Sequence, residues 1–498
     1  MNILFVYPEF PDTFWSFKHA LKFIRKKSSS PPLGLLTIAA MLPTTWAKRL
    51  VDMNVCELKA EDIQWADLVF ISAMVVQRQS AVEVIALAKS QKKTVIAGGP
   101  LFTMEPDTFP LVDHLILNEG EITLPLFLAD LAKGKAQRVY ETDQHADITV
   151  TPLPLWELID LRNYDSMSLQ YSRGCPFACD FCNVTSLLGH KMRLKGTQQF
   201  IAELDSLYKL GWRRNVFIVD DNFIGNKRQL KEELLPALIA WRKGKKGCLF
   251  ITEASINLSD DDDLINMMVK AGFTQVFIGI ETPDDVSLTE CGKSQNRNRD
   301  LVSSVKKLQT LGLQVMGGFI VGFDNDNQRT FDRQIEFIQK SGIVTAMVGL
   351  LQAPIGTGLY QRMLREGRLK KEGYSGDNVD GETNIVSVMP ADALKTGYRK
   401  ILDTIYSTKN YTERVMTFLK TFNPARHPVT MEAQEVLALF RSIWQIGIRG
   451  RRDERQSYWK LFFWSLFKHP AKFPLAITFS IYGYHFRKVN QLHVSGVA

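Results

Sequence analysis

Cysteine is scarce in this sequence outside one short segment. The 498 residues contain six cysteines; three lie between residues 175 and 182, whereas Cys56, Cys248 and Cys291 are scattered. Small secreted proteins that depend on disulfides carry many cysteines spread along a short chain. The pattern therefore excludes a disulfide framework and predicts a chain that works in a reducing compartment.

Long apolar runs are also missing. No stretch of 18 or more uninterrupted apolar residues occurs, so we expect no membrane-spanning helix. The first residues, Met1–Pro8, lack the basic start and the long apolar segment of a secretory signal, and they read as a β-strand. We therefore expect a cytoplasmic protein.

The excess of positive charge is confined to the C-terminal tail. The chain has a formal net charge of +8, and the segment from Arg441 to the end carries ten Lys or Arg against two Asp or Glu. The rest of the chain is therefore neutral. A basic tail can bind nucleic acid, anionic lipid or an acidic protein. Because no helix-turn-helix or RNA-binding module is recognisable, we expect no nucleic-acid partner.

The first part of the chain has the pattern of an α/β domain. Apolar segments at Ile3–Tyr7, Leu68–Ser72 and Thr94–Ala97 read as buried strands, and residues 80–90 are helical in pattern. This alternation predicts a doubly wound, Rossmann-like parallel sheet within residues 1–145. Sheets of this kind bind ligands at the carboxyl ends of their strands.

A second α/β pattern follows residues 146–168, which we interpret as a linker. Six further strands are expected, separated by helix-compatible stretches, at Leu169–Ser172, Val216–Asp220, Leu249–Glu253, Gln275–Ile280, Gln314–Val321 and Thr345–Leu351. These units predict a partial (β/α)6 barrel of the TIM type over residues 169–370, with its chemistry at the carboxyl ends of the strands. Residues 371–498 are predicted to form a helical domain with a basic amphipathic tail.

The cysteine-rich segment has a spacing that suits a metal cluster. Cys175, Cys179 and Cys182 form a C-x3-C-x2-C run at the end of a predicted strand. Iron–sulfur clusters usually take four cysteine ligands, so three thiolates leave one iron open for reaction. Structural zinc is the competing interpretation, and it would need a fourth ligand such as His190.

This motif resembles that of the radical S-adenosylmethionine superfamily. The resemblance implies a [4Fe–4S] cluster whose open iron binds S-adenosylmethionine, which is then cleaved to a radical. It also implies cofactor contacts from residues at the ends of later strands: Asp221, Asn222, Glu253, Glu281, Gly317 and Gly318. The alternative is structural, with Asp220 and Asp221 capping a following helix and the glycines serving turns.

The N-terminal domain resembles the cobalamin-binding domain of B12-dependent radical S-adenosylmethionine enzymes. Ser72 and the pair Gly98 and Gly99 match turns that flank the cofactor there, and Asn118–Glu121 resembles a further turn of this subgroup. The sequence lacks the Asp-x-His-x-x-Gly motif of B12 mutases, whose histidine replaces the lower ligand of cobalamin. The resemblance therefore implies cobalamin with no histidine on its lower face.

Most of the chain resembles the hopanoid C-2 methylases, through segments such as Pro31–Leu36, Val219–Gly225 and Ile278–Pro283. The resemblance implies a C-methyltransferase that acts on an unactivated carbon of a hydrophobic small molecule, a hopanoid or another lipid, with a flavodoxin or ferredoxin as electron donor. The alternatives are a non-methylating rearrangement or oxidation, a non-catalytic iron–sulfur or B12 sensor, and a tRNA methylthiotransferase. The last needs N-terminal cysteines for a second cluster, and only Cys56 precedes residue 175.

The tail contains two apolar blocks, Leu461–Phe467 and Phe473–Phe486, and neither is long enough to span a bilayer. Their aromatic residues and the flanking Arg and Lys suit an anchor in the membrane interface, which would place residues 456–498 on the inner membrane surface. The alternative is a helix packed on the barrel with its basic residues in solvent. The sequence does not decide between the two.

Overall fold

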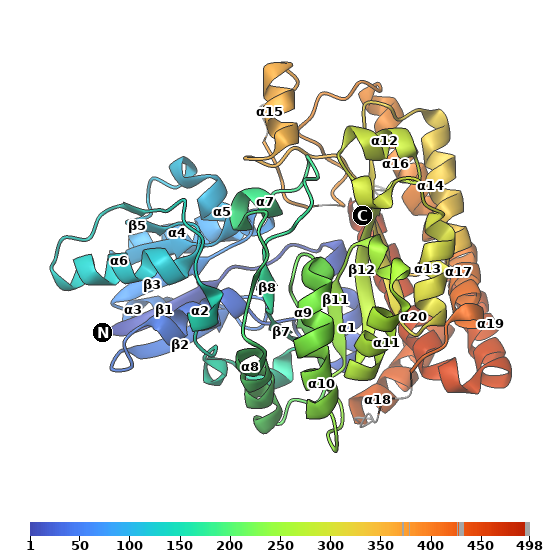
Figure 1. Cartoon of the computed structure of the whole chain (residues 1–498), viewed down its shortest axis with the longest axis horizontal. Coiled ribbons are helices and arrows are strands. Elements are labelled where there is room, and N and C mark those ends of the chain that lie inside the picture. Colours follow the sequence, from blue (N-terminus) through green and yellow to red (C-terminus); the bar gives the residue numbers. More distant parts are fainter. Residues whose placement is uncertain (371–372, 378, 426, 428–432, 494–498) are drawn as a thin grey trace.

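The computed structural model describes residues 1–370, 373–377, 379–425, 427 and 433–493. It contains two parallel sheets of six strands each, and helices from the end of the chain pack beside the second sheet (Figure 1). The predicted architecture of a Rossmann-like domain, a partial barrel and C-terminal helices is confirmed. Within the described residues, no helix has both the length and the apolar character needed to cross a bilayer.

The N-terminal sheet has the strand order β2-β1-β3-β4-β5-β6, and all its pairs are parallel. Its strands are β1 (Asn2–Tyr7), β2 (Ala47–Asp52), β3 (Leu68–Ser72), β4 (Thr94–Gly98), β5 (His114–Ile116) and β6 (Val139–Tyr140). Its helices are α2 (Leu33–Met41), α3 (Ala60–Trp65), α4 (Arg78–Ser90), α5 (Pro100–Met104) and α6 (Gly120–Ala132). The sequence predicts β1, β3 and β4 but not the other three strands. Four of the six residues of β2 are not buried, and β5 and β6 have only three and two residues.

The second sheet has the order β14-β13-β12-β11-β10-β7 and is also wholly parallel. Its strands are β7 (Ser166–Leu169), β10 (Asn215–Ile218), β11 (Phe250–Glu253), β12 (Phe273–Glu281), β13 (Gln314–Val321) and β14 (Ala346–Leu350). The main helices between them are α8 (Thr197–Lys209), α10 (Leu235–Trp241), α11 (Asp262–Ala271), α13 (Leu301–Thr310) and α14 (Gln328–Ser341). Because β14 and β7 end the sheet and do not pair with each other, the barrel is partial.

The first barrel strand begins earlier than predicted. The sequence places it at Leu169–Ser172, but β7 spans Ser166–Leu169, and it therefore starts inside the expected linker. The backbone N–H of Tyr171 donates to the buried carboxylate of Asp220 at 2.8 Å rather than to a neighbouring strand. The chain leaves the sheet at this point and forms a short antiparallel pair between β8 (Ser172–Arg173) and β9 (Arg193–Leu194).

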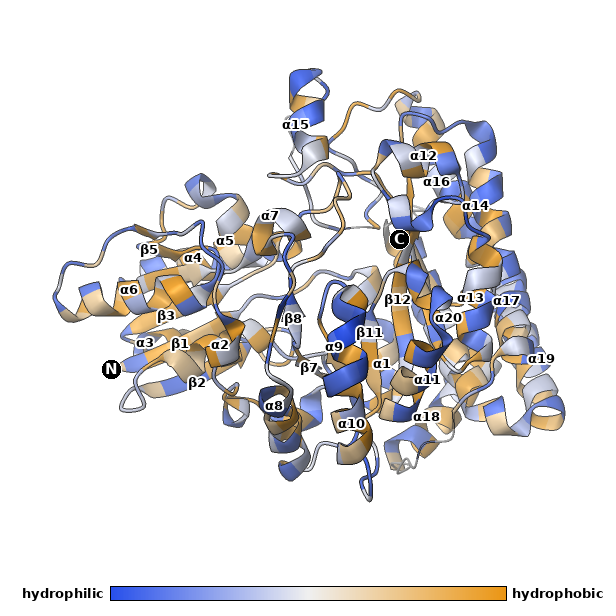
Figure 2. Cartoon of the chain, viewed as in Figure 1, coloured by the Kyte–Doolittle hydropathy of each residue, from blue (hydrophilic) through white to orange (hydrophobic). Residues whose placement is uncertain are grey.

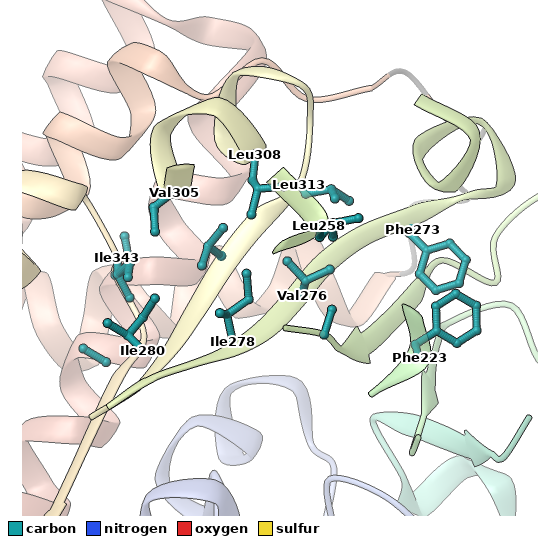
Figure 3. Packing of buried hydrophobic residues seen from close by; sticks show 14 of the residues in the cluster. Phe223, Leu258, Phe273, Val276, Ile278, Ile280, Val305, Leu308, Leu313 and Ile343 are labelled. Atoms are coloured by element: carbon teal, nitrogen blue, oxygen red, sulfur yellow. The ribbon is translucent and has the colours of Figure 1, made fainter. Parts of the chain in front are cut away.

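The barrel strands are packed differently on their two faces. In β12, Val276, Ile278 and Ile280 are fully buried, and they belong to the same core as Val305 and Leu308 of α13 (Figure 3). Side chains that alternate with them along the strands are only half-buried. The strands are mainly apolar, while polar residues are concentrated on the surrounding helices (Figure 2). The main core therefore lies between the sheet and its outer helices.

The C-terminal helices are α16 (Ala391–Ile405), α17 (Thr408–Thr421), α18 (Ala433–Ser442), a π-helical segment (Ile443–Ile448), α19 (Arg452–Lys468) and α20 (Phe473–His493). Helix α20 is part of the interior: Phe479 is fully buried, and Phe486 stacks on Phe14 with ring centroids 4.3 Å apart. The second apolar block of the tail is thus a packed helix. The first block lies in α19, where Phe463 and Phe467 stay exposed.

Candidate functional site

The three predicted cluster ligands lie in one loop that follows β8. Gly174 precedes this loop with φ of +93°, and a Cβ there would lie 2.8 Å from the carbonyl oxygen of Lys191. The backbone N–H of Cys175 donates to the Gly189 carbonyl at 3.2 Å, and that of Cys182 donates to the Cys179 carbonyl at 3.2 Å. Backbone contacts therefore fix the path of the loop, and glycine is required where it begins.

Two later segments hold the loop from the other side. The N–H of Asp180 donates to the carbonyl of Cys291, which follows α12 (Asp285–Glu290), at 3.1 Å. The N–H of Leu359, in α15 (Gly358–Arg365), donates to the Asp180 carbonyl at 2.8 Å. Arg362 of the same helix lies 3.4 Å from the Asp180 carboxylate. The cysteine loop is therefore supported both by the barrel and by residues beyond its last strand.

The three thiols are half-buried and close enough to interact electrostatically. Burial raises the pKa of all three, that of Cys182 to about 12, while the positive charge of Lys293 acts against the rise. No group of three His, Cys, Asp or Glu side chains converges on a single metal ion in the described ranges. His190, the proposed fourth zinc ligand, is exposed. The donor set therefore fits a cluster, in which each thiolate binds a separate iron, better than one zinc ion.

Acidic residues end or follow three successive strands, and Asp221 and Glu281 lie close enough to the thiols to raise their pKa. Asp221 follows β10, and its pKa rises to about 6 because it is buried. Glu253 ends β11, and burial together with the charge of Asp221 raises its pKa to about 8. The Glu253 side chain makes no hydrogen bond or ion pair with any residue that the structure describes. A half-buried carboxyl group with no such partner is a candidate for contact with a ligand.

Neighbouring polar residues have structural partners. Asp220 accepts hydrogen bonds from the N–H of Tyr171 at 2.8 Å and from the Ser172 hydroxyl at 2.6 Å, so it braces the segment before the cysteine loop. The capping interpretation of Asp220 is therefore wrong. The following short helix (Lys227–Gln229) is capped instead by Asn226. Asn222 is buried, and its side-chain oxygen accepts from the N–H of Ser255 at 3.2 Å.

Glu281 at the end of β12 has a strained backbone and a buried partner. Its φ is +62°, beside a shift in the pairing of β12 with β13, and its carboxylate lies 2.7 Å from the ammonium group of Lys293. A Cβ at Gly279 would lie 2.8 Å from that ammonium group. The side-chain amides of Asn296 and Gln334 donate to backbone carbonyls on either side of the shift. A non-glycine residue held in this conformation is typical of functional sites.

Lys293, Asn296 and Gln334 are site residues that the sequence analysis missed. Lys293 lies 12 positions after Glu281, on a loop beyond α12, and has no spacing motif of its own. Burial of Lys293 disfavours its charged form and by itself would lower its pKa. The negative charge of Glu281 and of the neighbouring thiolates outweighs this effect, so the pKa is raised overall. The only available signal was a lysine in a loop close to a predicted site. Such a loop gives no indication of where its side chains will point.

Gly317 and Gly318 in β13 lie against aromatic side chains, so no free space is left where their Cβ atoms would be. A Cβ at Gly318 would lie 2.8 Å from the Phe277 ring, and one at Gly317 would lie 2.8 Å from the ring of Phe319. Close packing of aromatic rings accounts for both glycines. Their contact with a cofactor stays a prediction.

The residues predicted to bind cobalamin come together at the carboxyl edge of the N-terminal sheet. Ser72 and Gly98 are register partners at the ends of β3 and β4. Gly99 has φ of +90°, and a Cβ there would lie 2.5 Å from the Ser72 hydroxyl oxygen. A Cβ at Gly98 would lie 2.6 Å from the carbonyl oxygen of Ile116, so packing within the sheet edge requires both glycines. Their contact with cobalamin, and that of Ser72, stays a prediction.

The cysteine loop and the N-terminal sheet are joined directly. The Arg173 guanidinium lies 2.8 Å from the Glu119 carboxylate and 2.7 Å from that of Glu121, and Arg193 lies 2.7 Å from Glu119. Burial would raise the pKa of Glu121, but Arg173 outweighs it and lowers that pKa. The Asn183 amide donates to the sulfur of Met104, at the end of α5, at 3.4 Å. The two predicted cofactor edges thus adjoin, and the turn at Asn118–Glu121 connects them.

Comparison with known proteins agrees with this geometry. Residues 169–338 match the radical SAM superfamily, and residues 357–497 match a domain of unknown function, DUF4070. An uncharacterized methyltransferase of Synechocystis sp. is 41% identical, covering 99% of this chain and 92% of the relative. Hopanoid C-2 methylase of Rhodopseudomonas palustris is 35% identical, covering 92% of this chain and 88% of the relative.

A solved structure shares the fold along the whole chain. The cobalamin-dependent S-adenosylmethionine radical enzyme OxsB, with aqua-cobalamin and S-adenosylmethionine bound, aligns with a TM-score of 0.62 at 14% identity, covering 100% of this chain and 81% of OxsB. The sequence matches extend through both sheets and the C-terminal helices. The chain therefore belongs to the radical SAM superfamily, in the group of methyltransferases that includes hopanoid C-2 methylase.

Proposed function

We propose that this chain is a cobalamin-dependent radical methyltransferase that methylates an unactivated carbon of a hydrophobic small molecule. The observation that carries the proposal is the junction between the three-cysteine loop and the N-terminal domain, at whose carboxyl sheet edge Ser72, Gly98 and Gly99 lie. The Arg173 ion pairs fix this junction. A reaction that uses both cofactors on one substrate needs their sites side by side.

The bound cofactors would supply the chemistry: the cluster with S-adenosylmethionine yields a hydrogen-abstracting radical, and cobalamin carries the methyl group. Cys175, Cys179 and Cys182 would hold the cluster. The carboxyl groups of Asp221, Glu253 and Glu281 can accept hydrogen bonds from the amino group or ribose hydroxyls of S-adenosylmethionine. Lys293 orients Glu281 and offsets negative charge around the thiolates.

The lining of the barrel supports a hydrophobic substrate. Phe217, Ile251 and Phe277 alternate along their strands with fully buried residues and are themselves only half-buried. Trp15, from the N-terminal domain, meets the Phe277 ring edge-on at 5.5 Å and donates its indole N–H to the sulfur of Met347 at 2.8 Å. An apolar surface of this kind suits a hopanoid or another lipid-like molecule.

Two partners belong to the same proposal. A flavodoxin or ferredoxin would supply the electron that starts each radical reaction. A hydrophobic substrate would also favour work at the inner surface of the membrane. Because Phe479 and Phe486 of α20 are packed in the interior, the part of this segment that supports an anchor is α19, where Phe463 and Phe467 are exposed.

Anaerobic turnover tests the proposed reaction. The full-length chain, reconstituted with iron and sulfide, is incubated with methylcobalamin, a reductant, S-adenosylmethionine and a candidate lipid. We expect 5′-deoxyadenosine and S-adenosylhomocysteine to form together. Formation of 5′-deoxyadenosine alone would indicate a non-methylating rearrangement or oxidation. Neither product from a fully loaded protein would contradict an enzymatic role and favour a sensor.

A further inference from the structure

The end of the chain exposes large apolar side chains along one helical face. Phe440 in α18, and Trp444 and Ile448 in the π-helical segment, are 60%, 52% and 49% exposed. Residues four positions apart lie on the same side of a helix. Leu437 of α18 is also exposed and extends the row by almost another turn.

Helix α19 carries a second exposed row. Phe463 is 49% and Phe467 is 74% exposed, and their rings are stacked with centroids 6.2 Å apart. Trp459 connects this row to the first, because its ring stacks on Phe463 and its indole N–H donates to the Gly447 carbonyl at 3.0 Å. Gly447 directly precedes Ile448. We call the two rows together the apolar face: Leu437, Phe440, Trp444, Ile448, Phe463 and Phe467.

Positive charge surrounds the apolar face. Residues 433–468 contain seven Lys or Arg and three Asp or Glu. All three acidic side chains are engaged in ion pairs: Glu435 with Arg214, Asp453 with Arg451, and Glu454 with Arg487. In contrast, Arg452, Arg455, Lys460 and Lys468 are exposed and have no acidic partner among the described residues. Uncompensated positive charge is therefore available beside the aromatic rings.

We propose that the apolar face docks on an anionic lipid bilayer. Exposed Trp and Phe rings insert at the level of the headgroups, and flanking Arg and Lys bind lipid phosphates. A second copy of the chain is a poorer occupant, because a symmetric dimer through this face would bring the same unpaired cations together. The apolar face differs from the membrane segment that the sequence predicts at residues 456–498. It includes part of α18, which precedes that segment, and it excludes α20, which is largely buried. The inference does not depend on methyl transfer.

Vesicle flotation tests the proposal with the full-length, cluster-loaded chain. We expect binding to phosphatidylcholine vesicles that contain phosphatidylglycerol, weaker binding to phosphatidylcholine alone, and loss of binding at high salt. Replacing both rings, Phe463→Ser with Phe467→Ser, should weaken binding at least about tenfold. Leu210→Ser is the matched control, because Leu210 is 53% exposed at the end of α8 and should leave binding unchanged.

Charge variants and oligomeric state complete the test. Arg452→Gln with Lys460→Gln should weaken binding to the anionic vesicles while both rings remain. Undiminished binding by the ring variant, or no binding to either vesicle, would overturn the proposal. A dimer in sedimentation that the ring variant dissociates would identify a second copy as the occupant and would also overturn it. Cleavage of S-adenosylmethionine by the ring variant, assayed without vesicles, should match wild type, which separates this test from that of the proposed reaction.

Discussion

The carboxyl edges of the two sheets have opposite chemical character. The barrel edge gathers charged and ionisable groups: three thiols, the carboxyls of Asp221, Glu253 and Glu281, and the ammonium group of Lys293. The edge of the N-terminal sheet presents bare backbone at Gly98 and Gly99 with one hydroxyl at Ser72. The first edge suits ligation of iron and recognition of a zwitterionic cofactor. The second has no charged side chain at these three positions and requires glycine at two of them.

The largest expected effect comes from removing one cluster ligand. Cys179→Ser should abolish the visible absorbance of the cluster and all formation of 5′-deoxyadenosine, because two thiolates cannot hold the cluster in place. Cobalamin binding at the other edge should persist. Cys248→Ser is the matched control, since Cys248 is buried between barrel elements and its sulfur lies 3.4 Å from the Trp212 carbonyl oxygen. Full cluster absorbance in the Cys179 variant would show that the ligands are assigned wrongly.

A smaller effect is expected at Lys293. Lys293→Met leaves the Glu281 carboxylate buried without its cation, and breaking a buried pair in this way costs about 3–5 kcal/mol. We expect a lower unfolding midpoint in denaturant and weaker binding of S-adenosylmethionine, measured by calorimetry, with cobalamin binding unchanged. Lys306→Met, an exposed lysine on α13, should behave as wild type. Wild-type affinity for S-adenosylmethionine in the Lys293 variant would remove this residue from the site.

At the carboxyl edge of the N-terminal sheet, we expect a bulky side chain to interfere with cobalamin binding. Gly99→Val adds a branched side chain at φ of +90°, where a Cβ lies 2.5 Å from the Ser72 hydroxyl oxygen. We expect cobalamin affinity to fall at least about tenfold while the cluster is retained. Gly134→Val controls for backbone strain, because Gly134 has φ of +67° in the same domain with nothing within 4 Å of its Cβ position. Equal cobalamin affinity in the two variants would argue against the edge as the binding site.

The smallest effect should appear in the pH dependence of stability. Burial and the charge of Asp221 raise the pKa of Glu253 from 4.5 to about 8, so the folded chain retains a proton that the unfolded chain releases. This contribution to stability is fully present below pH 4.5 and is lost as the pH rises through about 8. Glu253→Gln should therefore gain stability relative to wild type as the pH increases, as measured by denaturant unfolding of the cluster-free chain. A difference that stays constant across this range would contradict the assignment.

The sequence identified what depends on local spacing. The C-x3-C-x2-C run and the apolar segments of β12 and β13 are visible along the chain, and the cysteine loop, the barrel and Glu281 could be located from them. Lys293, Asn296 and Gln334 could not, because their roles depend on loops and helices that meet Glu281 only after folding. The end of β7 was misplaced for a similar reason: the carboxylate that binds the N–H of Tyr171 just after the strand belongs to Asp220, about 50 residues later in the sequence. The packing of α20 against Phe14 joins the two ends of the chain and has no local signature.

Metal analysis of two variants tests most directly whether the cluster and cobalamin bind at separate sheet edges. The full-length chain is loaded anaerobically with iron, sulfide and cobalamin, and bound iron and cobalt are measured for wild type, Cys179→Ser and Gly99→Val. The proposed sites predict that the cysteine variant loses iron and keeps cobalt, whereas the glycine variant loses cobalt and keeps iron. Retention of cobalt by Gly99→Val, or loss of both metals by each variant with the fold intact, would contradict two separate cofactor edges.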